Sequence, residues 1–255
     1  MALDSCLQWK TSTASCGVVV GCDHHQEWLL KWWWSHYSKT NHLPVTFFDF
    51  GMTMSARKWC ARHGSLVSFS LPKGFLSSKN PFPLPSHWPK RWADTVRNQR
   101  LVWFTKAFSL LLTPYEKTVW IDLDCQCRKA VNSVFDFCDR ESGFAVAVDD
   151  KNTVKKWKQM GFLAPTVTGY QTGVIAFVAQ SKVITAWAEH CLLYRNNEYS
   201  EQTALSHTIA KKKWPISLLS SDYNWLTPEQ EHPSAVIAHY GGEERKVHLI
   251  RELKF

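Results

Sequence analysis

The chain has 255 residues, of which 45% are hydrophobic and 14% aromatic, and it carries a formal net charge of +8. Its longest apolar runs are about five residues, far short of the roughly 20 that a membrane-spanning helix needs, so we expect a soluble protein. The positive charge suits an anionic partner, whether a nucleotide, a phosphorylated acceptor, an acidic membrane surface or a nucleic acid.

We expect a single domain over residues 17–255, preceded by a tail over residues 1–16, because a chain of this length is at the upper end for one core. The tail has no continuous hydrophobic segment, so a secretory signal is not expected and the predicted location is cytoplasmic. In that compartment the eight cysteines are expected to be reduced thiols rather than a disulfide framework.

Strands and helices alternate over the first part of the chain. Residues 17–22 are predicted to form a buried strand, and residues 26–37 a helix with apolar side chains at helical spacing. Two further short strands are expected at 45–50 and 65–70, with a helix around 55–62 between them. This alternation predicts an α/β fold with a mostly parallel sheet covered on both faces.

The alternation breaks between residues 71 and 98, where prolines and glycines cluster around Trp88 and Trp92. Loops this long inside a compact domain are usually functional lids or disordered segments, and the tryptophans favour a lid. The α/β pattern then resumes. The remaining expected elements are helices over 99–112, 182–194 and 200–211, the last with Ser200 as its cap, and strands over 118–124, 144–148, 172–178 and 235–238.

The apolar run at 118–124 ends in Asp122 and Asp124. Side chains alternate faces along a strand, so both carboxylates are expected to point the same way. Two oxygen donors at a strand end are typical of a site that holds Mg²⁺ or Mn²⁺ against substrate phosphates. The alternative is that both aspartates merely solvate the end of a buried strand.

Other polar motifs follow further strand ends. Asp23 follows the first strand, Asp149 follows the strand at 144–148, and His239 ends the last expected strand. In order and spacing, these motifs and the Asp-x-Asp pair resemble the nucleotide-sugar-dependent glycosyltransferases with the glycosyltransferase-A fold. The resemblance is strongest to the retaining galactosyl- and glucosyltransferases of family 8.

The resemblance implies a donor-binding set of residues. Val20 and Asp23 would contact the nucleotide from the first strand, and Lys106 would contribute a cation from the helix before the Asp-x-Asp strand. Gln171 lies in Gln171-Thr172-Gly173, which takes the place of the family's Asn-Ala-Gly turn.

The resemblance also implies a metal site and a diphosphate site. Asp122, Asp124 and His239 would be the metal ligands. His239 opens the run His-Tyr-Gly-Gly-Glu-Glu-Arg, in which Gly242 and either Arg245 or Lys246 would hold the diphosphate.

The reacting sugar would lie above Glu201 and Gln202, which match an acidic-Gln pair in the family. Gln202 would place its amide oxygen below the anomeric carbon. Asp149 would lie on the acceptor side, and Trp88 and Trp92 would stack on an acceptor sugar.

The implied activity is metal-dependent transfer of a hexose from a UDP-sugar to an acceptor, with retention of anomeric configuration. The cofactor would be Mn²⁺ or Mg²⁺, and the acceptor a saccharide, a glycolipid or a protein. No nucleic-acid partner is expected, and membrane association would be peripheral at most. The basic clusters at 155–158 and 211–213 are expected to be solvated helix ends or loops.

Two alternatives remain at this point. A haloacid-dehalogenase-like phosphatase also places an Asp-x-Asp after an apolar strand, and Asp149-Asp150 could mimic its second acidic motif, although such enzymes carry the first motif near the start of the chain. A non-catalytic carbohydrate- or partner-binding protein on the same scaffold is the other. The presence of both carboxylates and the histidine disfavours it.

Overall fold

The structure, a computed structural model, describes residues 14–76, 82–139, 142–226, 230, 232–242, 247, 249–251 and 253. Its central feature is a seven-stranded sheet. In chain order its strands are β1 (Ala14–Cys22), β2 (Val45–Asp49), β3 (Ser65–Ser68), β4 (Tyr115–Ile121), β6 (Phe144–Val148), β7 (Tyr170–Val178) and β8 (Ser217–Leu218). In space they follow the order β3-β2-β1-β4-β7-β6-β8.

The sheet is mixed and mostly parallel. Strands β3, β2, β1 and β4 are parallel neighbours, and β6 is parallel to β8, whereas β7 runs antiparallel to both β4 and β6. The predicted fold class is therefore confirmed. Because β7 is reversed, the carboxyl ends of β4 and β6 lie beside the start of β7, and this edge of the sheet carries the candidate site.

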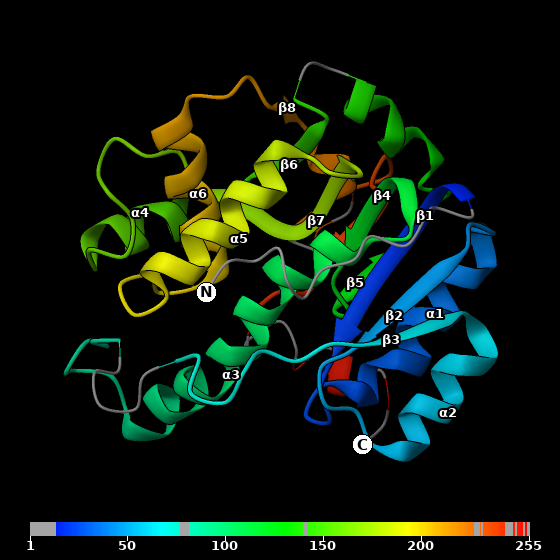
Figure 1. Ribbon diagram of the computed structural model, residues 1–255, viewed down its shortest axis with the longest axis horizontal. Helices are drawn as coiled ribbons and strands as arrows, with labels where there is room; N and C mark the ends of the chain where they lie inside the picture. The colour runs from blue at the N-terminus through cyan, green and yellow to red at the C-terminus, as the bar shows by residue number, and fades with distance from the viewer. Residues whose placement is uncertain are drawn as a thin grey trace.

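Helices cover both faces of the sheet (Figure 1). One face packs against α1 and α2 and the other against α3, α5 and α6, and each face has its own cluster of buried apolar side chains. The α-helices are α1 (Leu30–Thr40), α2 (Met54–His63), α3 (Lys90–Ser109), α4 (Lys151–Gln159), α5 (Lys182–Tyr194) and α6 (Glu201–Lys212). The 3-10 helices are η2 (Glu27–Leu29), η3 (Leu110–Leu112), η4 (Asn132–Asp139) and η5 (Ser221–Tyr223).

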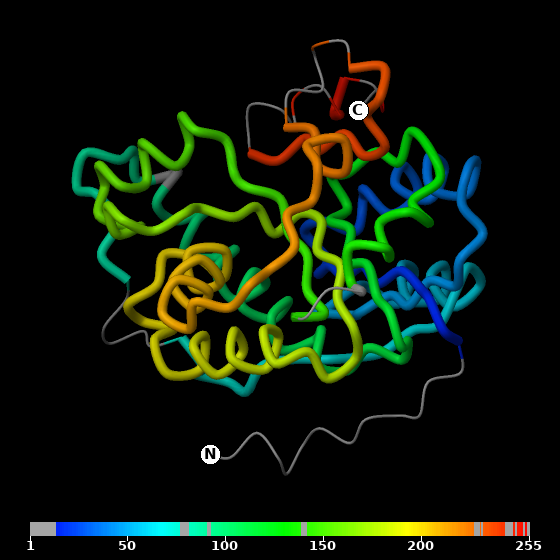
Figure 2. The backbone as a smooth tube through the Cα atoms, turned by 90° about the horizontal axis from the view of Figure 1, so that it is seen from above, coloured from blue at the N-terminus to red at the C-terminus, as the bar shows by residue number. Residues whose placement is uncertain are grey.

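A second, two-stranded sheet brings the late part of the chain back to the middle. It pairs β5 (Cys125–Cys127) with β9 (Ile237–His239) in antiparallel register, and Cys125 lies opposite His239. In Figure 2 the orange chain leaves the helices on one side and reaches the opposite side of the molecule, where the C-terminal segment lies. This pairing places His239 beside the turn that holds Asp124.

The structure corrects three expectations about the elements. Residues 90–98 are helical rather than part of the predicted loop, because no proline or glycine interrupts the chain between Pro89, the N-cap of α3, and Pro114. Strand β4 ends at Ile121, so Asp122 and Asp124 lie beyond the strand. Strand β1 begins at Ala14, inside the predicted tail.

All seven cysteines within the described residues are free, and most are buried. Among the same residues, the structure contains no helix with both the length and the apolar character needed to cross a bilayer.

Candidate active site

A polar cleft of about 300 Å³ opens where β4 and β6 end and β7 begins. It gathers most of the residues that the sequence predicted as functional. Those lining it are Lys106, Asp122, Asp124, Asp149, Gln171, Glu201, Gln202, His239 and Gly242. Val20 and Asp23 do not line it, and Arg245 and Lys246 lie outside the described residues.

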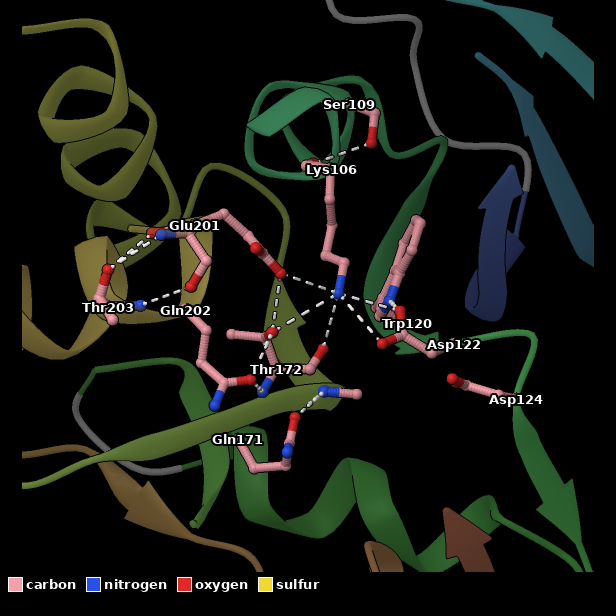
Figure 3. Close-up of polar contacts among 12 residues, drawn as sticks. Lys106, Ser109, Trp120, Asp122, Asp124, Gln171, Thr172, Glu201, Gln202 and Thr203 are labelled. Atoms are coloured by element: carbon pink, nitrogen blue, oxygen red, sulfur yellow. Dashed lines mark hydrogen bonds and ion pairs between the residues drawn. The ribbon is translucent and has the colours of Figure 1, made fainter. Parts of the chain in front are cut away.

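Lys106 is the charged centre of this cleft (Figure 3). Its Nζ lies 2.9 Å from Oδ1 of Asp122 and 3.2 Å from Oε1 of Glu201, and it donates to the carbonyl oxygen of Thr172 at 3.3 Å. Burial alone would lower the pKa of Lys106, but the carboxylates of Asp122 and Glu201 outweigh burial and raise it. The ammonium group therefore stays charged and holds two acidic side chains together.

Asp122 is held from a second side by Trp120, whose indole N–H donates to Oδ1 at 2.6 Å. Glu201 is buried, and burial raises its pKa although the charge of Lys106 opposes that effect. Thr172 donates its hydroxyl to Glu201 at 2.9 Å. These contacts fix the orientation of both carboxylates before any substrate arrives.

Asp124 lies apart from the Lys106 cluster, on the other side of Asp122 (Figure 3), and it pairs with His239. Nε2 of His239 lies 3.4 Å from Oδ1 of Asp124. Nδ1 lies 2.9 Å from the amide oxygen of Asn224, which can only accept, so Nδ1 donates this hydrogen bond and Nε2 is the ring atom that faces Asp124. In metal sites, a hydrogen bond from the ring nitrogen that does not bind the metal fixes the orientation of the imidazole.

Two glycines make room for the imidazole. A Cβ at Gly173 would overlap the His239 ring, and one at Gly241 would lie 2.7 Å from Nε2. Their close approach explains why glycine occupies these two positions. The result is a cradle in which the buried ring can take one orientation.

The donor set around Asp124 suits a hard divalent cation. Asp124, Cys125 and His239 offer ligand atoms within 4.8 Å of one another. Burial raises the pKa of the Cys125 thiol well above its usual value. Thiolates suit softer metals, so the Asp124 carboxylate and the His239 imidazole are the donors that suit Mn²⁺ or Mg²⁺. Asp122 does not belong to this group of atoms, because its carboxylate is turned toward Lys106 and Trp120.

Asp149 and Gln202 form a further part of the cleft, beyond the end of β6. The Gln202 amide donates to Oδ2 of Asp149 at 2.9 Å, and Gln171 donates to Oδ1 at 3.4 Å. Burial raises the pKa of Asp149 to about 6, although the N–H of Asp150 opposes this shift. The amide oxygen of Gln202 accepts from the backbone N–H of Thr172 at 3.2 Å, so both ends of this side chain are engaged.

Helix α6 places Glu201 and Gln202 at its first turn. Ser200 caps this turn by accepting from the N–H of Thr203, and the Thr203 hydroxyl accepts from the Ser200 N–H in return. The preceding turn is tied to α3 because the Arg100 guanidinium donates to the carbonyl oxygen of Tyr199 at 3.0 Å.

Glu198 also holds the turn that precedes α6. Hydrogen bonds from His190 and His207 lower its pKa to about 2 although burial would raise it. The turn before α6 is therefore tied both to α3 and to the α5–α6 hairpin.

Aromatic residues that the sequence did not single out line the cleft. Trp103, Trp157 and Tyr199 lie on its wall. Trp88, which was predicted to stack on a sugar, packs edge-on against Phe162 and Tyr199 and does not line the cleft. The side chain of Trp92 lies outside what the structure describes. Composition alone could not separate these rings from the many core tryptophans.

The two acids of the phosphatase alternative do not act as a pair. Asp149 points into the cleft, whereas Asp150 caps α4 by accepting from the N–H of Asn152 at 2.9 Å. Its role is that of a helix cap.

Comparisons with known proteins identify the fold. Neither a protein-family profile nor a curated protein sequence matches the chain. Mouse xyloside xylosyltransferase 1 shares its fold with a TM-score of 0.58 and 11% identity, over 90% of this chain and 98% of that one. The galactosyltransferase LgtC, solved with donor and acceptor sugar analogs, matches with a TM-score of 0.52 and 14% identity over 89% and 87%.

The glycosyltransferase GlyE of Streptococcus pneumoniae matches with a TM-score of 0.56 and 14% identity, over 94% of this chain and 61% of that one. At such identities the likeness establishes the fold. The chain has the glycosyltransferase-A fold that the sequence predicted.

Proposed function

We propose that this protein is a metal-dependent glycosyltransferase that moves a hexose from a UDP-sugar to an acceptor with retention of configuration, in the cytoplasm. The proposal rests on three groups of side chains that lie together in one cleft. The Asp124–His239 pair, the buried cation Lys106 and the Asp149–Gln202 pair lie together in it, at the end of β4 in a glycosyltransferase-A fold.

The residues on the donor side of the cleft would stabilise the negative charge that develops on a leaving diphosphate. A bound Mn²⁺ or Mg²⁺ would supply positive charge to the diphosphate oxygens as the glycosidic bond breaks. Asp124 and His239 would hold this ion, and Asp122, the third predicted ligand, lines the same cleft but would join them only by turning away from Lys106. Lys106 keeps the Asp122 and Glu201 carboxylates in place, 2.9 and 3.2 Å from its Nζ.

The hydrogen bonds of Asp149, on the acceptor side, favour retention of anomeric configuration over inversion. An inverting enzyme needs a carboxylate that is free to take the proton of the acceptor hydroxyl. Asp149 already accepts hydrogen bonds from Gln171, Gln202 and the N–H of Asp150, which fills three of its roughly four acceptor positions. In a retaining reaction the leaving diphosphate takes that proton, and Asp149 with Gln202 orients the reacting groups.

UDP binding tests the metal part of the proposal. By calorimetry, UDP should bind the wild-type protein with Mn²⁺ present and far more weakly with chelator. Asp124→Asn and His239→Ala should each weaken the Mn²⁺-dependent binding by about 10- to 100-fold, because each removes a ligand or its charge.

The matched control is Asp94→Asn, which changes an exposed carboxylate that pairs with Arg97 on α3. This variant should bind UDP like the wild type. UDP affinity that is equal with Mn²⁺ and with chelator would remove the metal from the proposal.

A further inference from the structure

The cleft has an aromatic wall for which the donor-side chemistry gives no role. It consists of Trp103 from α3, Trp157 from α4, and Tyr199 from the turn before α6, and all three rings are half-buried. The Trp103 and Trp157 ring centroids lie 6.0 and 6.1 Å from that of Tyr199. Tyr199 is itself stacked on Phe162 at 4.3 Å with an interplanar angle of 5°, so the wall is rigid.

Partly exposed aromatic faces in a polar cleft favour a ligand with both an apolar face and polar edges. A sugar ring has both, because its C–H groups can pack on an indole while its hydroxyls bond to polar neighbours. Gln99 and Thr153 also line the cleft and supply such neighbours. The wall therefore fits a saccharide.

A second hollow, of about 500 Å³, adjoins the cleft at Asp149, which lines both. Lys151, Lys155 and Lys158 of α4 line this hollow. Their spacing puts them on one side of the helix, which we call the lysine face. Within the described residues, none of the three ammonium groups takes part in an ion pair.

Lysines four residues apart on a helix repel one another, so an unpaired lysine face destabilises α4 unless an anion covers it. Asp149 can offset at most one of these three positive charges. Among the residues that line the second hollow, no other is acidic. The hollow therefore carries net positive charge beside the acceptor end of the cleft.

Helix α4 joins the two features. Thr153 and Trp157 line the cleft, and the lysine face lines the second hollow. The cleft and the second hollow lie on different sides of α4 and meet only at Asp149, just before the helix begins. An oligosaccharide that passes this end of the helix can thus place one ring on Trp157 and a charged substituent of another ring on the lysine face.

We propose that the acceptor is an anionic saccharide, which packs a sugar ring on the aromatic wall and places a phosphate, sulfate or carboxylate group on the lysine face. This inference rests on the proposed transferase function and names the class of its acceptor. It assigns Trp157 to ring binding and the three lysines to discrimination between charged and neutral acceptors.

The test uses the full chain on an array of neutral, phosphorylated, sulfated and uronic-acid-bearing oligosaccharides, with an immobilised single-stranded oligonucleotide as a non-saccharide polyanion. Measurements are made at about 0.15 M salt, where charges beyond about 8 Å are screened. We expect anionic oligosaccharides to bind in preference to neutral ones. The separate arms of the array show which anionic group is recognised.

The variant Lys151→Gln/Lys155→Gln/Lys158→Gln should bind the anionic oligosaccharides about tenfold more weakly, since it removes three exposed ion pairs that are each individually weak. Its binding of neutral ones should not change. Trp157→Ala should weaken both. The matched control, Lys211→Gln/Lys212→Gln/Lys213→Gln, removes the same charge from the end of α6 and should bind like the wild type.

Four outcomes would overturn the inference: exclusive binding of neutral glycans, equal binding of the oligonucleotide, equal loss in both triple variants, or no glycan binding at all. UDP binding with Mn²⁺, measured on the same samples, reports on the proposed function independently. A protein that binds anionic glycans but no UDP would refute that function and leave the glycan site standing.

Discussion

Lys106 holds two acidic side chains of the cleft in place. It is buried, it is charged, and it lies between Asp122 and Glu201. Removing one partner from a buried ion pair leaves an uncompensated charge and typically costs 3–5 kcal/mol. We therefore expect Lys106→Met to lower the free energy of unfolding by roughly 3 kcal/mol or more.

The second variant, Glu201→Gln in the Lys106→Met background, should recover part of that loss because it removes one of the two stranded carboxylates. Lys182→Met, at an exposed position in the first turn of α5, serves as the control and should change stability by less than about 0.5 kcal/mol. Denaturant unfolding measures all three. Lys106→Met and Lys182→Met of equal stability would show that the cation is dispensable.

Asp149 links stability to pH. Its pKa is about 6 in the folded protein, against 3.8 for an ordinary aspartate, so the folded state holds this proton more tightly than the unfolded state does. The contribution of Asp149 to stability is then greatest at low pH and falls as pH rises toward 6 and beyond. Between pH 5 and pH 7 the loss should be about 1 kcal/mol.

Unfolding free energies at pH 5 and pH 7, measured for the wild type and for Asp149→Asn, isolate this contribution. From pH 5 to pH 7, the free energy of unfolding of the variant should fall by about 1 kcal/mol less than that of the wild type. Identical pH dependence in both proteins would mean that Asp149 titrates in its ordinary range.

Single residues also show where sequence reasoning stops. The alternation rule places Asp122 and Asp124 on one face only while the strand continues, and β4 ends at Ile121. Beyond it the carboxylates serve different partners, Lys106 for Asp122 and His239 for Asp124. That both would reach one cleft was predictable. Their division between two partners depends on Lys106, which is distant in sequence.

At the scale of elements, the start of α6 sets the geometry of the site. Ser200 accepts from the N–H of Thr203, and the capping box holds the turn that carries Glu201 and Gln202. Ser200→Ala should lower the free energy of unfolding by about 1 kcal/mol, as is usual for a lost N-cap. Hydrogen exchange of the Thr203 amide should be faster in this variant.

Ser181 offers a matched control at the N-cap of α5. Its hydroxyl makes no cap hydrogen bond and has no partner among the described residues. Ser181→Ala should therefore be neutral or slightly stabilising, because it removes a buried polar atom that is unsatisfied. Equal losses from the two Ser→Ala changes would contradict the assigned cap.

Elements with a clear apolar period were predictable, and those without one were not. The helix predicted over 182–194 is α5, and the cap predicted at Ser200 is the cap of α6. Helix α4 was missed because it buries no residue fully and reads as a lysine-rich loop. The strand predicted at 235–238 overlaps β9, whereas the three-residue strand β5 was not predicted. Their pairing, which positions His239, is a long-range contact.

For the whole molecule, alternating strands and helices were enough to predict the α/β class, and the order of the motifs was enough to predict the glycosyltransferase-A fold. The antiparallel β7 was not predictable from periodicity, because a buried strand has the same pattern in either direction. Yet this reversal brings the end of β4, the end of β6 and the start of β7 to a single edge. The site is thus a consequence of topology as much as of motif.

Cleavage of a UDP-sugar tests the central proposal most directly. A panel of UDP-hexoses is incubated with the protein in Mn²⁺ or in chelator, consumption is followed by mass spectrometry, and the anomer first released is identified by proton NMR on quenched samples. We predict that at least one UDP-hexose is cleaved slowly by water with Mn²⁺ only, that the α anomer appears first, and that Asp124→Asn abolishes the reaction. A folded protein that cleaves none of the donors, or cleaves them equally in chelator, would contradict the proposed function, and initial release of the β anomer would contradict retention.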